Sequence, residues 1–136
     1  MCNVGVATPG DVALSVLASV IGHRADKGWV MVDAGWMAMS RDRGTQAQAV
    51  DHGYGAICDA EGELLGDWLM SAANQEHGIV SRRDGVVDAD VATRFPIGTQ
   101  LRVLPNHACA TAAQFASYTV LGIDGTTHEW PRFNGW

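Results

Sequence analysis

Turn-forming residues interrupt the apolar segments of this chain at short intervals, which favours short strands over long helices. Val, Ile, Thr and Trp recur in short runs bounded by Gly, Asp and Asn, and Gly alone accounts for 16 of the 136 residues. Such runs are typical of β-strands joined by tight turns. The longest apolar stretch, residues 12–22, contains serines and is far shorter than the roughly 20 residues that a membrane helix needs. The sequence therefore predicts a soluble, mainly β protein.

The length and the order of the segments predict one all-β domain over residues 4–136, a compact barrel or sandwich of about seven or more short antiparallel strands. Residues 11–23 fit both a helical stripe and a strand alternation, so periodicity alone leaves them open. The polar connector after them and the apolar run 29–35 favour a hairpin. Residues 40–51 lack apolar periodicity and are expected to form an exposed loop.

Turn signals predict the remaining strands. Strand pairs are expected around 59–62, Asp84–Gly85 and Asp124–Gly125, of which Asp84–Gly85 is the strongest hairpin signal in the chain. The segment "TQLRVL" alternates cleanly and is expected to be a strand that ends at Pro105, which cannot donate a ladder hydrogen bond.

Charge and cysteine content exclude several classes of function. The formal net charge is -6 and the only adjacent basic pair in a polar segment is Arg82–Arg83, so we expect no nucleic-acid partner. The N-terminus lacks a basic segment followed by an apolar one, and three widely spaced cysteines do not form an even set. These features predict a reducing, cytoplasmic location.

The segment "PNHACAT", residues 105–111, contains the strongest candidate for a metal site. On an extended backbone His107 and Cys109 would face the same side, about 6.6 Å apart along the strand. Imidazole and thiolate ligands suit zinc better than magnesium or calcium. Two ligands would leave open positions on the metal. The alternative is that Cys109 is a small buried hydrophobe and His107 a hydrogen-bonded turn residue.

A second cluster, "NQEHG" at residues 74–78, supplies the weak catalytic candidates Glu76 and His77. In a loop both side chains could serve one site, whereas a polar turn is the structural alternative. The other histidines, His23, His52 and His128, are expected to be solvated at turns or strand ends.

The motifs, taken in order, resemble a known family. The segments "VALSVLASVIGH", "VDAGWMAMSRDRG", "GYG", "NQEHG", "PNHACAT" and "WPRFNGW" are similar to the C-terminal domain of the D-threonine aldolase and D-serine dehydratase family. The resemblance covers nearly the whole chain, and it favours a strand over residues 14–22.

The resemblance implies a function and a cofactor set. Family members are lyases of D-3-hydroxy amino acids in which a (β/α)8 barrel binds pyridoxal phosphate, similar to alanine racemase. A divalent metal, zinc or alternatively manganese, is held by a His-x-Cys or His-x-Asp pair in the β domain. His107 and Cys109 match this pair, and Cys109 resembles the dehydratases more than the aldolases. The metal would bind the β-oxygen of the substrate as a Lewis acid.

The sequence departs from the family in lacking the barrel, which needs about 250 residues. The only lysine, Lys27, lies in a polar turn and is a poor Schiff-base candidate. We therefore expect no pyridoxal phosphate chemistry unless another chain supplies a barrel, and we expect either that partner or a homo-oligomer to cover the exposed apolar face.

Two alternative functions are compatible with the same residues. One is a non-catalytic binding or assembly module that keeps the fold without the metal. The other is a self-sufficient zinc hydrolase, which would need further ligands such as His52 or His77 and a base such as Glu76.

Overall fold

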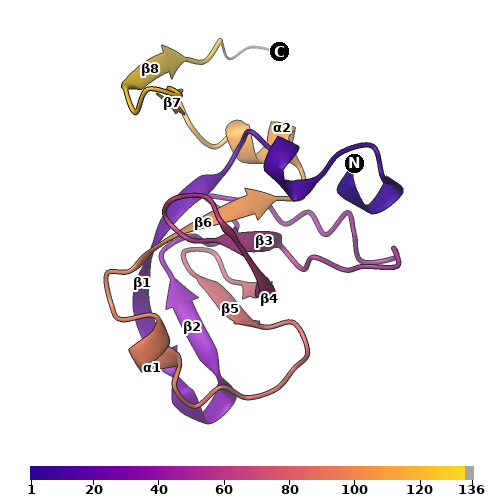
Figure 1. The fold of residues 1–136 in the computed structure, drawn as a ribbon, viewed down its shortest axis with the longest axis vertical. Helices are drawn as coiled ribbons and strands as arrows, with labels where there is room; N and C mark the ends of the chain where they lie inside the picture. The colour runs from indigo at the N-terminus through magenta and orange to yellow at the C-terminus, as the bar shows by residue number, and fades with distance from the viewer. Residues whose placement is uncertain (134–136) are drawn as a thin grey trace.

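Alternating apolar residues close six strands of this protein into an antiparallel barrel, as seen in a computed structural model that describes residues 1–133 (Figure 1). Around the barrel the strands follow the order β1-β2-β5-β4-β3-β6, and β6 pairs back onto β1. The barrel strands are β1 (Val16–Arg24), β2 (Trp29–Val32), β3 (Gly55–Cys58), β4 (Leu64–Ala73), β5 (Gly78–Arg82) and β6 (Gln100–Pro105).

The remaining elements are short. A hairpin of β7 (Ser117–Leu121) and β8 (Thr127–Pro131) extends away from the barrel (Figure 1). The two α-helices are α1 (Val91–Arg94) and α2 (Ala108–Ala112), and 3-10 turns occupy Cys2–Val4, Pro9–Asp11 and Ala25–Lys27. None of the helices in this part of the chain is long and apolar enough to cross a membrane.

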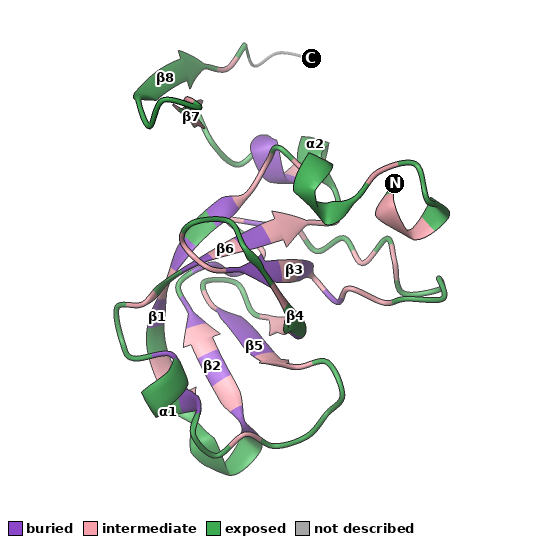
Figure 2. Ribbon diagram, viewed as in Figure 1, coloured by how far each residue is buried: buried purple, intermediate pink, exposed green. Residues whose placement is uncertain are grey.

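The core fills the barrel because each strand points every second side chain inward. Along β1, for example, Val16, Ala18 and Val20 are buried while Leu17 and Ile21 are about half exposed. The inward positions of the other strands carry Val30, Val32, Ile57, Met70, Val80, Leu101 and Val103, all at most 1% exposed. Figure 2 shows this buried interior in contrast to β8, which is exposed along its length.

One end of the barrel is closed by α1 and the residue after it. Phe95 packs edge-on against Trp68, with ring centroids 4.9 Å apart. The His23 imidazole contacts the backbone oxygen of Phe95 at 2.7 Å from Nε2, which must be the donor because a carbonyl only accepts. Helix α2 lies toward the opposite end of the barrel (Figure 1).

The structure confirms the all-β prediction and most of its hairpins. Residues 11–23 contain strand β1, β3 pairs with β4 across the expected turn, and β7 pairs with β8 around Asp124–Gly125. Residues 40–51 form a loop, as predicted.

The hairpin predicted at Asp84–Gly85 is wrong. The turn itself forms, since the Asp84 carboxylate accepts the N–H of Val86 at 3.0 Å and Gly85 has a φ of 74°. No strand follows it, because β5 already pairs with β2 on one side and β4 on the other. The exposed Val86 and Val87 therefore meet no free edge of the closed barrel.

Candidate metal centre

The predicted ligands His107 and Cys109 lie where β6 ends and α2 begins. Asn106 donates from Nδ2 to the backbone oxygen of Gly53 at 2.7 Å, which holds the chain as it leaves the strand. His107 keeps an extended φ of -137° and is the N-cap of α2, whereas Cys109 lies inside the helix. The prediction of an extended backbone through both residues is therefore wrong, because the chain turns into a helix directly after His107.

Cys109 differs from the other two cysteines in being exposed. Cys58 is buried, and burial raises the pKa of its thiol, while Cys2 is half-buried. The His107 side chain is also exposed, at 48%. Both candidate ligands can therefore reach a solvent-borne metal, and the interpretation of Cys109 as a buried hydrophobe does not hold.

A carboxylate contacts the candidate ligand His107. Oδ2 of Asp42 lies 2.7 Å from Nδ1 of His107, although the two residues are 65 positions apart in the sequence. An ionised carboxylate can only accept, so Nδ1–H donates and Nε2 keeps a free lone pair. Asp42 belongs to the 40–51 loop, which the fold thus brings over the start of α2.

A buried hydrogen bond fixes the same loop to the same helix. The Thr111 hydroxyl donates to the backbone oxygen of Met39, and both residues are 1% exposed. The chain then bends sharply at Ser40, whose φ of 140° is the one positive value among the non-glycine residues that the structure describes. The N–H of Asp42 donates to Oγ of Ser40 at 3.1 Å, so the bend directs Asp42 toward α2.

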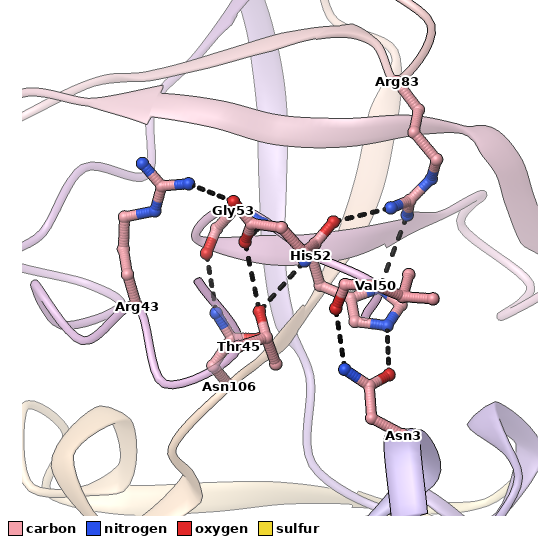
Figure 3. A network of polar contacts seen from close by, with 9 residues as sticks. Asn3, Arg43, Thr45, Val50, His52, Gly53, Arg83 and Asn106 are labelled. Carbon is pink, nitrogen blue, oxygen red and sulfur yellow. Dashed lines mark hydrogen bonds and ion pairs between the residues drawn. The ribbon is translucent and has the colours of Figure 1, made fainter. Parts of the chain in front are cut away.

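A polar network anchors the far end of this loop to the barrel (Figure 3). Asp51 accepts hydrogen bonds from Arg43, from Thr45 and from the N–H of Gly53. Burial raises the pKa of the Asp51 carboxyl, but the hydrogen bond from Gly53 and the charge of Arg43 outweigh it, so the pKa lies below its usual value. Gly53 has a φ of 60°, and a Cβ there would lie 2.4 Å from the backbone oxygen of Met70, so no side chain fits.

His52 belongs to this network and is not free to bind a metal. Nε2–H donates to Oδ1 of Asn3 at 2.9 Å, and Nδ1 faces the Arg83 guanidinium at 3.4 Å (Figure 3). Burial lowers the pKa of His52, and the charge of Arg83 lowers it further. Both ring nitrogens of the neutral side chain therefore have partners.

The weak candidates Glu76 and His77 lie in the turn between β4 and β5. His77 accepts a hydrogen bond from Nδ2 of Asn74 at 2.9 Å, and Glu76 accepts one from Gln75. The backbone of the same turn accepts hydrogen bonds from the N–H groups of Trp36 and Met37. These contacts are those of a structural turn, and a catalytic role for Glu76 or His77 stays a prediction.

The donor set of the site suits a thiophilic divalent metal. His107 offers a free Nε2 and Cys109 an exposed thiol at the first turn of α2. Within residues 1–133, no three His, Cys, Asp or Glu side chains form a group that could hold a metal. His107 and Cys109 alone are too few for a closed structural metal site.

Sequence reasoning missed Asp42, Asp51 and Thr111. The loop around the two aspartates carried only a weak signal, its density of polar residues without apolar periodicity. Thr111 stood inside the "PNHACAT" segment, but its contact with Met39 spans 72 positions and leaves no local pattern.

Comparison with known proteins places the chain in a family. The family model described as a putative serine dehydratase domain matches residues 13–121. D-threo-3-hydroxyaspartate dehydratase from Delftia sp. (strain HT23) is 61% identical over the whole chain, which covers 36% of that protein. D-serine dehydratase from Schizosaccharomyces pombe is 32% identical over 131 residues, which cover 93% of this chain and 28% of the relative.

Solved structures agree with these matches. The Delftia dehydratase superposes with a TM-score of 0.96 and an alanine-racemase-like protein from Idiomarina loihiensis with 0.91 at 44% identity; the chain covers 36% and 35% of their chains. Two further structures of a D-threo-3-hydroxyaspartate dehydratase, each 60% identical to this chain with a TM-score of 0.96, carry an alanine substitution: one of a histidine and one, in the metal-free form, of a cysteine two positions later. This chain spans about a third of the length of these relatives, and it belongs to the putative serine dehydratase domain family.

Proposed function

We propose that this protein is the metal-binding β domain of a lyase that removes water from D-3-hydroxy amino acids. The observation that carries the proposal is the pair of exposed side chains at the start of α2, His107 and Cys109. The spacing of this pair equals that of the histidine and the cysteine substituted in the two D-threo-3-hydroxyaspartate dehydratase variants, and the cysteine variant is in the metal-free form.

In this proposal, Nε2 of His107 and Sγ of Cys109 hold the metal. A thiolate ligand favours zinc over manganese. When bound, the metal supplies Lewis-acid polarisation of the substrate's 3-hydroxyl oxygen, which makes hydroxide a better leaving group. The residues of this chain orient the metal through α2 and leave positions open for that oxygen.

We assign the pyridoxal phosphate of the complete enzyme to a barrel domain outside this stretch of sequence. The only lysine of the chain, Lys27, stacks its Nζ over the Trp29 ring at 4.4 Å. It lies between β1 and β2, away from α2 (Figure 1). The contact is that of a surface cation–π pair, which supports a structural role for Lys27.

We further propose that the surface between the β7–β8 hairpin and the barrel packs against a partner, either a barrel domain or a second copy of this chain. A groove of about 740 Å³ lies there, lined by residues that include Leu14, Phe115 and Trp130. Phe115, Leu121 and Trp130 are 40%, 56% and 60% exposed. Light scattering after size exclusion tests this part, and a well-behaved monomer would count against a homo-oligomer.

Metal analysis tests the central proposal. Plasma emission spectrometry on protein purified without added metal should find about one zinc per chain. The double variant His107→Ala/Cys109→Ala should lose it and still fold, because both side chains are exposed.

The control is His128→Ala/Cys2→Ala, which removes the same two residue types outside α2 and should keep its zinc. Wild-type protein that binds neither zinc, cobalt nor manganese in titrations would contradict the proposal. That result would favour the non-catalytic module instead.

A further inference from the structure

We infer that Asp42 is the positioning residue of the metal site, in that it fixes the tautomer and the orientation of His107. The inference rests on the proposed function, because it assigns to His107 the role of a ligand. It adds a residue from a loop that is 65 positions away and that the His-x-Cys pattern does not include.

The hydrogen bond between the two side chains sets the tautomer of His107. Oδ2 of Asp42 lies 2.7 Å from Nδ1 of His107. Because the carboxylate accepts, the proton of the neutral ring is held on Nδ1 and the lone pair is held on Nε2. Carboxylates that bind the remote nitrogen of a metal-binding histidine orient the ring and increase the basicity of the ligating nitrogen.

Asp42 is itself held in place from the side of α2. The Thr111 hydroxyl donates to the backbone oxygen of Met39, so the loop begins from a buried contact with the helix that carries Cys109. The left-handed φ of Ser40 and its hydroxyl then direct the backbone of Asp42. His107 and Asp42 are thus both fixed relative to α2.

The neighbours of Asp42 already have partners of their own. The Arg41 guanidinium stacks over Trp36 at 4.6 Å, and that of Arg43 lies over Tyr54 at 5.4 Å. Arg43 also forms an ion pair with Asp51. Neither arginine is hydrogen-bonded to the Asp42 carboxylate, which instead faces His107.

The exposure of the pair separates a positioning role from a structural one. The side chains of His107 and Asp42 are 48% and 41% exposed, and a hydrogen bond between groups so exposed contributes little to stability. Loss of Asp42 should therefore change the behaviour of His107 and of a bound metal while leaving the fold intact.

Two measurements on the full chain test the inference, with the variants Asp42→Ala and Asp42→Asn. Long-range ¹H–¹⁵N NMR spectra of the metal-free protein at about pH 8 report the tautomer of His107. Titration with cobalt(II), followed by the charge-transfer absorption of the Cys109 thiolate, reports metal affinity. The matched control is Asp26→Asn, another exposed carboxylate, which pairs with Arg24 at 2.9 Å.

We expect wild type to hold the Nδ1–H tautomer and Asp42→Ala to shift toward Nε2–H. Cobalt affinity should fall about 10- to 100-fold in Asp42→Ala. It should fall less in Asp42→Asn, whose amide oxygen can still accept from Nδ1–H, and stay unchanged in Asp26→Asn. The amide spectrum should remain that of the wild-type fold in all variants.

The failures are distinguishable. If wild type binds cobalt and Asp42→Ala keeps the same dissociation constant and the same His107 tautomer, this inference is overturned. The proposed function then still stands. Absence of cobalt binding by wild type would overturn the proposed function and, with it, the positioning role of Asp42.

Discussion

The barrel wall and the rim around α2 are held together by different forces. The wall consists of paired strands whose inward side chains are almost completely buried. We define the rim cluster as Asp42, Asp51, Asn106, His107 and Thr111. Its members are held by side-chain hydrogen bonds, and among them Thr111 alone is buried. Apolar burial thus stabilises the barrel, and polar contacts orient the side chains of the candidate site.

The difference predicts that the two regions respond differently to substitution. Burial stabilises roughly in proportion to the apolar area removed from water, whereas partly exposed polar contacts contribute little to stability and much to geometry. The free energy of unfolding should therefore report on the wall, and metal binding on the rim cluster.

The largest expected effect lies in the wall. Leu101→Ala removes a side chain that is 1% exposed and should lower the free energy of unfolding by about 2–5 kcal/mol. Urea denaturation measures this. Leu17→Ala, on the strand paired with that of Leu101 but 49% exposed, is the control and should cost less than about 1 kcal/mol. Equal losses of stability in both variants would contradict the claim that apolar burial stabilises the wall.

Thr111 lies where the two regions meet, so its substitution should change both the free energy of unfolding and metal binding. Thr111→Val keeps the shape but leaves the Met39 carbonyl without its buried donor, which should cost about 1–3 kcal/mol. Cobalt affinity should fall as well, since the loop carrying Asp42 loses its anchor. Thr119→Val, at an exposed position of β7, should change neither quantity. A Thr111→Val protein with normal metal affinity would show that the anchor is dispensable for the site.

Replacing Asp51 should have a smaller effect on the free energy of unfolding, and this effect should depend on pH. Its folded-state pKa is lowered, so its contribution is fully present above the unfolded pKa of about 3.9 and is lost as the pH falls through the folded value. The stability difference between wild type and Asp51→Asn should thus be largest near pH 7 and shrink below about pH 4. Urea denaturation at both pH values measures it, and a difference independent of pH would contradict the assignment.

The smallest effect is expected in the β7–β8 hairpin. Trp130 is 60% exposed, so Trp130→Ala should change the free energy of unfolding by no more than about 0.5 kcal/mol in dilute protein. A thermal melt checks this. A loss of several kcal/mol would mean that the hairpin belongs energetically to the barrel wall.

Local patterns sufficed to predict the wall but not the rim cluster. The alternation in "TQLRVL" and the turn signals between β3 and β4 are properties of neighbouring residues, and both predicted elements form. The failure at Asp84–Gly85 has a non-local cause, the occupied edges of β5. Helix α2 has five residues, too few to show helical periodicity, so the geometry of His107 and Cys109 was predicted wrongly although the residues themselves were named.

The bend at Ser40 has a consequence for protein engineering. A designer who transferred only the His-x-Cys pair to another barrel would obtain two side chains on a helix end, with the imidazole free to rotate. The transferable unit is larger and consists of two separate segments. One runs from the end of β6 into α2, and the other runs from Met39 to Asp42 and includes Ser40 with its positive φ. A graft that includes this backbone kink would bring the orienting carboxylate with it.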